Sequence, residues 1–181
     1  VLLDEPSVPV NPEVRAAALK RHVAYRAYQQ GTGEKSTVDS LNAWADKLCS
    51  EKKWGVLMTH GVVRGYAAMS DPEIFRAHLK YVKSRERDIW IDTFARIARY
   101  EKERDDAKLT VSGKPGSVTC VLAGALDPKV YDVPLTVCIE APGATSVAAT
   151  RDGRALPVRV KDGAVLIEAA PDARPIEVTW R

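Results

Sequence analysis

With 181 residues, of which 45% are hydrophobic, the chain can bury the core of one large domain or two small ones, and we expect two. Its 27 basic and 24 acidic residues give a formal net charge of +3, and the basic side chains are spread among acidic neighbours, which argues against nucleic-acid binding. No apolar run approaches the roughly 20 residues that span a bilayer, so we predict no membrane span.

The three cysteines indicate neither a disulfide framework nor a metal site. Cys49, Cys120 and Cys138 are odd in number and lack the short spacing of metal ligands. Cys120 and Cys138 lie in apolar runs typical of strands, where a buried thiol is the commoner outcome. The cysteines therefore leave the redox compartment open.

Helix and strand signals alternate through the N-terminal half. Asn11 and Pro12 predict a helix start, because asparagine caps free amides and proline is tolerated at the first helical position. A short strand is expected at 23–25, with Arg26 at its end. Apolar residues at helical spacing then predict a helix over 36–50.

The next run, 54–60, reads Trp-Gly-Val-Leu-Met-Thr-His and meets a glycine. It predicts a buried strand that delivers one polar side chain, His60, to the edge of a sheet. That edge is where α/β enzymes place their chemistry. His60 is therefore the first candidate for a functional residue.

A second unit of the same kind follows. Ser70 and Glu73 form a capping-box pattern that predicts the start of another helix. The run 88–93 repeats the apolar strand pattern, and a final helix is expected over 94–103. Alternating helices and strands predict a parallel sheet that is flanked by helices.

From about residue 105 the pattern changes to short β-rich runs that are separated by turns. Asp152-Gly153 and Asp162-Gly163 predict tight hairpins, because both central positions of such turns need a positive φ. We predict seven short strands and a small all-β sandwich over 106–181, after a first domain over 1–105.

Residues 21–104 resemble the C-terminal part of the polysaccharide deacetylase (NodB-homology) family of carbohydrate esterases, a little under half of the chain. The family is a distorted (β/α) barrel that removes N- or O-acetyl groups from polysaccharides with a divalent metal and a bound water. The resemblance thus implies an α/β fold, the C-terminal part of such a barrel, ahead of the sandwich. It rests on these features in order: Arg26 after a short strand, Trp44 on a helix, the run 54–61, the helix begun by Ser70, and the run 89–93 followed by 97–100.

The resemblance assigns roles to the end of the 54–60 strand. His60 matches the histidine of the family's Leu-x-His motif, which acts as general acid and protonates the leaving amine or sugar oxygen. Met58 stands where the motif has leucine, whose side chain helps to wall the acetyl-methyl pocket. Methionine is flexible and apolar enough to take that place.

The family's metal-binding motifs are absent from the sequence. Its Thr-Phe-Asp-Asp run supplies the base and a metal ligand, its His-x-x-x-His run supplies two more ligands, and neither occurs here. We therefore expect no metal on this chain alone. In the complete enzyme the resemblance implies a divalent metal, zinc as first choice, and a missing N-terminal half of the catalytic domain that holds it.

Each candidate has a structural alternative. His60 could merely bond to backbone groups at a strand end, although a histidine that titrates near neutral pH suits proton donation. Arg26 could orient a carboxylate or contact sugar hydroxyls, or form a surface ion pair. Trp90 could stack on a sugar face or lie in the core. Asp92 could bond to His60 or cap the helix that follows.

We therefore predict metal-dependent deacetylation of an acetylated polysaccharide or oligosaccharide, with His60 as general acid and Met58, Arg26 and Trp90 near the substrate. The alternative is a non-catalytic glycan-binding or structural protein that keeps part of the esterase fold. An α/β-hydrolase is disfavoured, since no Gly-x-Ser-x-Gly elbow occurs. An extracytoplasmic location, periplasmic or secreted, is expected from the resemblance.

Overall fold

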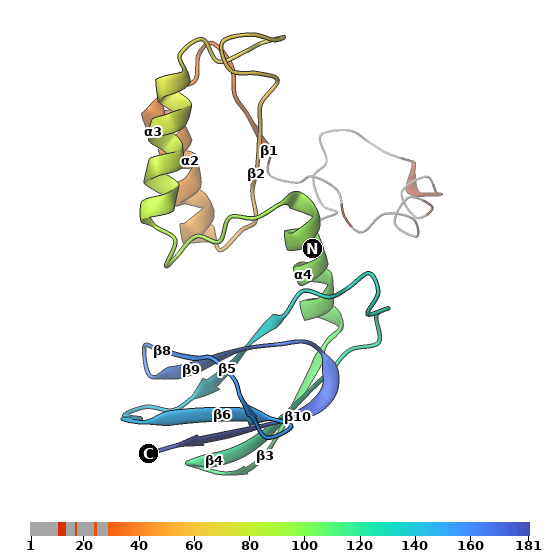
Figure 1. The fold of residues 1–181 in the computed structure, drawn as a ribbon. Coiled ribbons are helices and arrows are strands. Elements are labelled where there is room, and N and C mark those ends of the chain that lie inside the picture. The colour runs from red at the N-terminus through yellow and green to blue at the C-terminus, as the bar shows by residue number, and fades with distance from the viewer. Residues whose placement is uncertain (1–10, 14–16, 18–23, 25–28) are drawn as a thin grey trace. The chain divides into compact units, whose positions relative to one another are not determined.

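The computed structural model describes residues 11–13, 17, 24 and 29–181 (Figure 1). The chain divides into two compact units, Val1–Phe94 and Ala95–Arg181. The division falls at the start of helix α4 (Phe94–Asp106), whereas the sequence placed the domain boundary after that helix. The reason is that α4 packs on the β-rich unit, where Tyr100 lies against its hydrophobic core.

The described part of the first unit contains a β–α–β element. Strand β1 (Gln29–Gly31) pairs in parallel with β2 (Val56–Met58), and helix α2 (Val38–Glu51) connects them. Among the described residues these two strands form the whole parallel sheet, and no closed barrel is present there. The predicted β–α–β order is therefore present, and the barrel stays a prediction.

Helix α2 begins and packs for reasons visible in the sequence. Thr37 Oγ1 accepts a hydrogen bond from the Ser40 amide at 3.1 Å, and Ser40 Oγ accepts one from the Thr37 amide at 3.1 Å, a reciprocal capping box. The helix buries Leu41 and Ala45. A Cβ at Gly55 would lie 2.1 Å from Leu48 Cδ1 and 2.6 Å from Trp44 Cζ2, so any other residue there would force these side chains of α2 to move.

Helix α3 (Pro72–Ser84) packs beside α2 (Figure 1). Its N-cap is Asp71, whose Oδ1 accepts from the Glu73 amide at 2.8 Å, so the predicted Ser70 cap was one residue early. Asp71 is the N-cap because Pro72 occupies the first helical position, which proline favours, and the N-cap directly precedes that position. His78 is 3% exposed, its Nδ1 lies 2.9 Å from Asn42 Oδ1, and burial lowers the pKa of its imidazole.

One predicted strand of the first unit did not form, and another lies mostly outside the described residues. The run 88–93 is irregular, with Trp90 47% and Ile91 58% exposed, so these apolar side chains do not lie inside a sheet. The strand predicted at 23–25 lies mostly outside the described residues, and Ala24 is in no helix or strand. The strand that is described nearest to it is β1, Gln29–Gly31.

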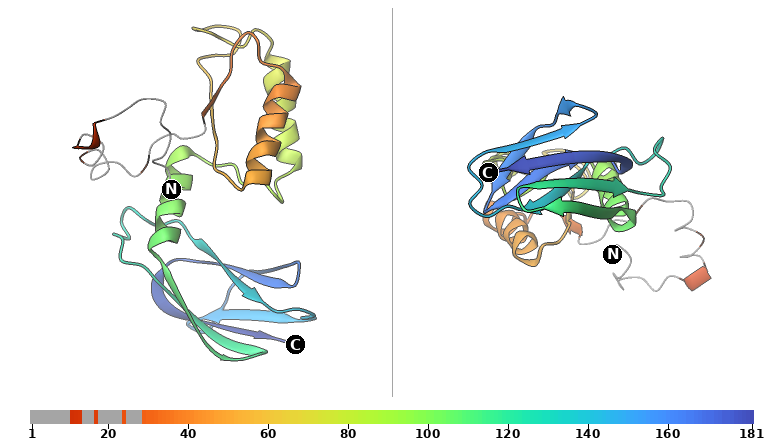
Figure 2. Two further views of the ribbon diagram at one scale, coloured as in Figure 1. Left: turned by 180° about the vertical axis from the view of Figure 1, so that it is seen from behind. Right: turned by 90° about the horizontal axis from the view of Figure 1, so that it is seen from below.

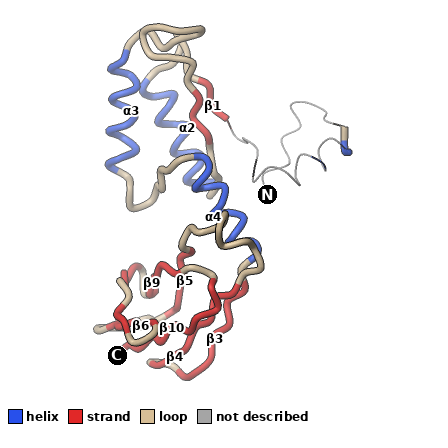
Figure 3. Tube along the Cα trace, turned by 45° about the vertical axis from the view of Figure 1, so that its right-hand side comes forward, coloured by secondary structure: helices blue, strands red, loops and turns tan. Residues whose placement is uncertain are grey.

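The second unit is built from two antiparallel sheets after α4 (Figure 3). One has the strand order β3-β4-β10-β6-β7 and the other β5-β9-β8. The strands are β3 (Lys108–Lys114), β4 (Ser117–Ala123), β5 (Leu135–Glu140), β6 (Val147–Arg151), β7 (Arg154–Ala155), β8 (Val158–Lys161), β9 (Ala164–Ala169) and β10 (Asp172–Trp180). All but the two-residue β7 correspond to strands predicted from the sequence.

Alternating residues of both sheets form one core. Strand β5 alternates buried and more exposed positions, as expected for a strand with one face inside. Cys120, Val165, Ile176 and Val178 are fully buried, at 0% exposure. The prediction of a buried thiol is therefore confirmed for Cys120 and wrong for Cys138, which is exposed. Burial raises the pKa of the Cys120 thiol, which keeps it protonated.

The hairpin turns took the predicted form. Asp152 and Gly153 have φ values of 52° and 72°, and Asp162 and Gly163 have 51° and 76°. Both central residues of each turn are thus in the left-handed region, which aspartate and glycine tolerate better than other residues.

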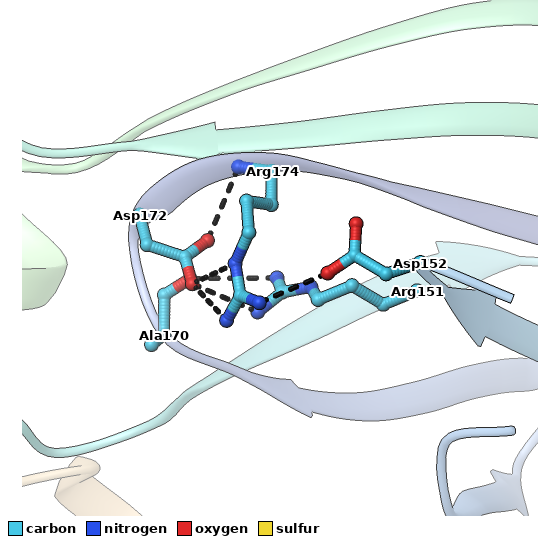
Figure 4. A network of polar contacts seen from close by, with 5 residues as sticks. All are labelled: Arg151, Asp152, Ala170, Asp172 and Arg174. Carbon is cyan, nitrogen blue, oxygen red and sulfur yellow. Dashed lines mark hydrogen bonds and ion pairs between the residues drawn. The ribbon is translucent and has the colours of Figure 1, made fainter. Parts of the chain in front are cut away.

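A network of charges ties the end of β6 to β10 (Figure 4). Arg151, which is 9% exposed, donates to Asp172 Oδ2 at 3.3 Å, and Arg174 donates to the same oxygen from Nε at 2.8 Å and to Asp152 Oδ2 from Nη1 at 2.9 Å. Burial alone would raise the pKa of Asp172, but hydrogen bonds from Arg174 and both arginine charges hold it below its usual value. The network braces β10 where its register shifts between Asp172 and Pro175, at the bend seen in Figure 2.

Glu103 on α4 is a buried carboxyl group. It is 1% exposed, Oε2 accepts from the Val133 amide at 3.2 Å, and Oε1 has no partner among the described residues. Burial raises the pKa of Glu103; Asp132 raises it further, and the Val133 hydrogen bond and Arg99 oppose the shift. Folding thus favours the protonated form of this side chain.

We expect Glu103→Gln to flatten the pH dependence of stability. Because the folded pKa is raised, the contribution of Glu103 is fully present below its unfolded value of 4.5 and is lost as pH rises through the folded pKa. The glutamine variant should gain stability relative to the parent as pH increases from about 4 to 8, measured by urea unfolding at each pH. A constant difference across that range would contradict the assignment.

Candidate functional site

The carboxyl ends of the two parallel strands lie together. The Thr32 amide donates to the Met58 carbonyl at 2.9 Å, which continues the β1–β2 pairing by one step. Thr59 and His60 follow directly after β2. In sheets of this kind the carboxyl ends carry the functional side chains, because the connections there leave room for a ligand.

His60 is exposed at this edge and contacts one aromatic side chain. Its imidazole ring lies 5.5 Å from the Tyr66 ring, centroid to centroid, at an interplanar angle of 82°. This is the edge-to-face arrangement that aromatic rings favour. An exposed imidazole can exchange protons with solvent or a ligand, which is the first requirement for the predicted general acid.

The loop over residues 61–69 that carries Tyr66 is closed by its own backbone. The Val63 amide donates to the Met69 carbonyl at 2.7 Å, and the Met69 amide donates to the Gly61 carbonyl at 3.1 Å. Met69 is 1% exposed and anchors the loop in the interior. The loop therefore has a defined shape.

Parts of this loop are in strained conformations. Val63 has a φ of 70° and Ala67 a φ of 47°, in the left-handed region that residues with a Cβ rarely adopt. A Cβ at Gly61 would lie 2.0 Å from the Arg64 carbonyl oxygen, so no other residue fits there. Backbone strain of this kind persists only where the surroundings enforce it, and it is commonest at functional sites.

Thr32 is a residue of this edge that sequence reasoning missed. It is 6% exposed, and its Oγ1 has no hydrogen-bond partner among the described residues. A Cβ at its neighbour Gly33 would lie 3.4 Å from the Ala67 carbonyl oxygen, so this turn adjoins the loop over 61–69. In the sequence Thr32 stands between Gly31 and Gly33, which could have marked it. It was missed because the strand beside β2 had been expected at 23–25.

The other predicted site residues have different outcomes. Met58 is the last residue of β2, half-buried, and pairs with Gly31. Trp90 lies in the irregular segment between α3 and α4. Arg26 lies outside the described residues, so its role stays a prediction. Asp92 Oδ1 accepts from the Thr93 amide at 2.8 Å, a local bond at the start of α4.

The described residues offer no ready metal site. Within 11–13, 17, 24 and 29–181, no three side chains of the histidine, cysteine, aspartate and glutamate types are placed to hold one ion. In the same part of the chain, no helix combines the length and the apolar character needed to cross a membrane.

The chain is similar in sequence to an enzyme that is named for a polysaccharide. It is 31% identical over 96 residues to a gellan lyase from a Bacillus species. The match covers 50% of this chain but 4% of the lyase, so the chain spans only a small part of that relative. No family model matches the chain.

Solved structures give weaker similarities. An α-L-fucosynthase and an α-fucosidase of Thermotoga maritima share 11% and 12% sequence identity with the chain, each with a TM-score of 0.28. The matches cover 83% and 84% of this chain and 38% of each neighbour. A structural similarity of this size carries no argument about fold or activity.

Proposed function

We propose that the chain is part of an enzyme that acts on a polysaccharide, and that the reaction is hydrolytic removal of acetyl groups. The observation that carries the proposal is an exposed histidine, His60, at the carboxyl edge of the parallel β1–β2 pair. The sequence similarity to a gellan lyase supports a glycan substrate. The acetyl reaction rests on the resemblance of residues 21–104 to polysaccharide deacetylases.

In this proposal His60 acts when the tetrahedral intermediate collapses. The bond between the acetyl carbon and the sugar nitrogen or oxygen breaks, and the departing atom takes a proton from the imidazolium. Without that proton the leaving group would depart as a poorly stabilised anion. General acid catalysis of this kind contributes about 10²- to 10⁴-fold to a rate.

Met58 would form an apolar wall for the acetyl methyl group, since it is half-buried at the end of the same strand. Arg26 and Trp90 remain proposed substrate contacts. The divalent metal implied by the resemblance does not fit the described residues, which provide no ligand set. We therefore propose that residues outside the described ranges supply its ligands, and we derive no step through it. An extracytoplasmic location is part of the same proposal.

The test is an acetate-release assay on the complete protein with two probes, an N-acetylated chito-oligosaccharide and an O-acetylated xylan. Acetate release from either probe supports the proposal. Oligosaccharide binding without acetate release would replace it with the alternative, a glycan-binding protein that keeps part of the esterase fold. If the protein neither binds an oligosaccharide nor releases acetate, the proposed deacetylase and the glycan-binding alternative are both contradicted.

A further inference from the structure

Tyr66 is unusually exposed for an aromatic residue on a well-defined loop. Its side chain is 82% exposed, the highest value among the large hydrophobic side chains of the described residues. The ring nevertheless has a definite neighbour, since it meets the imidazole of His60 at 82°. Because an edge-to-face contact covers at most one face of the ring, at least one face of Tyr66 is open to a ligand.

The loop over residues 61–69 that carries Tyr66 is already closed before any ligand binds. Two backbone hydrogen bonds, of 2.7 and 3.1 Å, close the loop at Met69, and Met69 itself is buried. Val63 and Ala67 are held at positive φ on either side of Tyr66. A binding surface that is already rigid avoids the entropy cost of ordering a loop on association.

We propose that Tyr66 is a stacking platform for the sugar ring whose substituent His60 protonates, an inference that rests on the proposed function. The C–H groups on one face of a pyranose ring are apolar and pack against an aromatic face, while its hydroxyl groups stay at the rim. A ring stacked on Tyr66 lies next to His60 because the two side chains touch. Tyr66 therefore selects a pyranose and sets its distance from the acid.

The test compares three variants of the complete protein with two unbranched probes, an N-acetylated chitopentaose and a cellopentaose without acetyl groups. Binding is followed by NMR titration, in which the His60 and Tyr66 side-chain signals report the site. Tyr66→Ala should weaken binding of the chitopentaose about 3- to 10-fold, the size of one aromatic contact, and Tyr66→Phe should keep it. Tyr131→Ala, in the other unit, is the matched control and should change nothing.

The outcomes separate stacking from other roles. Unchanged affinity in Tyr66→Ala would overturn the proposal, as would a failure of both sugars to bind the parent protein. If Tyr66→Ala shifts only the NMR signals of His60 and leaves affinity intact, Tyr66 positions the histidine, and stacking is also overturned. If both sugars bind through Tyr66 but the complete protein releases no acetate, the platform stands and only the proposed reaction fails.

Discussion

Replacing His60 with alanine is expected to lower acetate release by the complete enzyme about 10²-fold or more, with little change in KM. The reason is that proton donation to the leaving atom occurs only in the transition state, so its loss slows turnover without weakening substrate binding. The exposed imidazole at the end of β2 is free of the buried packing whose loss would unfold the protein. Acetate release at saturating substrate measures the effect.

Controls make this result specific. Lys80→Ala removes an exposed charge from α3 in the same unit and should leave turnover unchanged. His60→Gln keeps the size and polarity of the side chain but cannot donate a proton as an imidazolium does, so it should lose the rate as well. Full activity in either His60 variant would remove the assignment of His60 as general acid.

Ile176→Ala is expected to destabilise the second unit by about 2–5 kcal/mol. Ile176 is 0% exposed on β10, the strand between β4 and β6, where its side chain belongs to the core between the two sheets. Removing it leaves a cavity that neighbouring strands cannot close without breaking their register. Urea unfolding, followed by a probe of β structure, gives the change in free energy.

The control for this prediction is Thr179→Ala on the same strand. Thr179 is exposed, so its loss should cost under about 1 kcal/mol, the range of strand propensity alone. Equal effects of the two substitutions would show that the sandwich core does not depend on Ile176.

The fold of the second unit was largely predictable from the sequence because its determinants are local. Aspartate-glycine pairs specify turns with two positive φ values, and the turns at Asp152 and Asp162 have them. Alternation with a period of two residues marked strands such as β5 and β9, whose buried and more exposed positions follow that pattern. Neither signal needs information about distant residues.

The first unit was harder because a short apolar run has no diagnostic period. Residues 88–93 have the composition of a strand, yet whether they pair depends on a neighbouring strand, and the structure leaves Trp90 and Ile91 substantially exposed. The strand next to β2 was expected at 23–25, and β1 at Gln29–Gly31 takes that place. As a result, the polar residue found beside Met58 is Thr32.

The sequence by itself determined that His60 stands at the end of an apolar strand, and that a β-rich unit with two tight hairpins follows. Only the tertiary structure decided what surrounds that histidine. The contact with Tyr66, the buried hydroxyl of Thr32 and the strained turn at Val63 all depend on how a loop closes on itself and against β1. Such closure is set by backbone hydrogen bonds and packing between residues that local patterns do not relate.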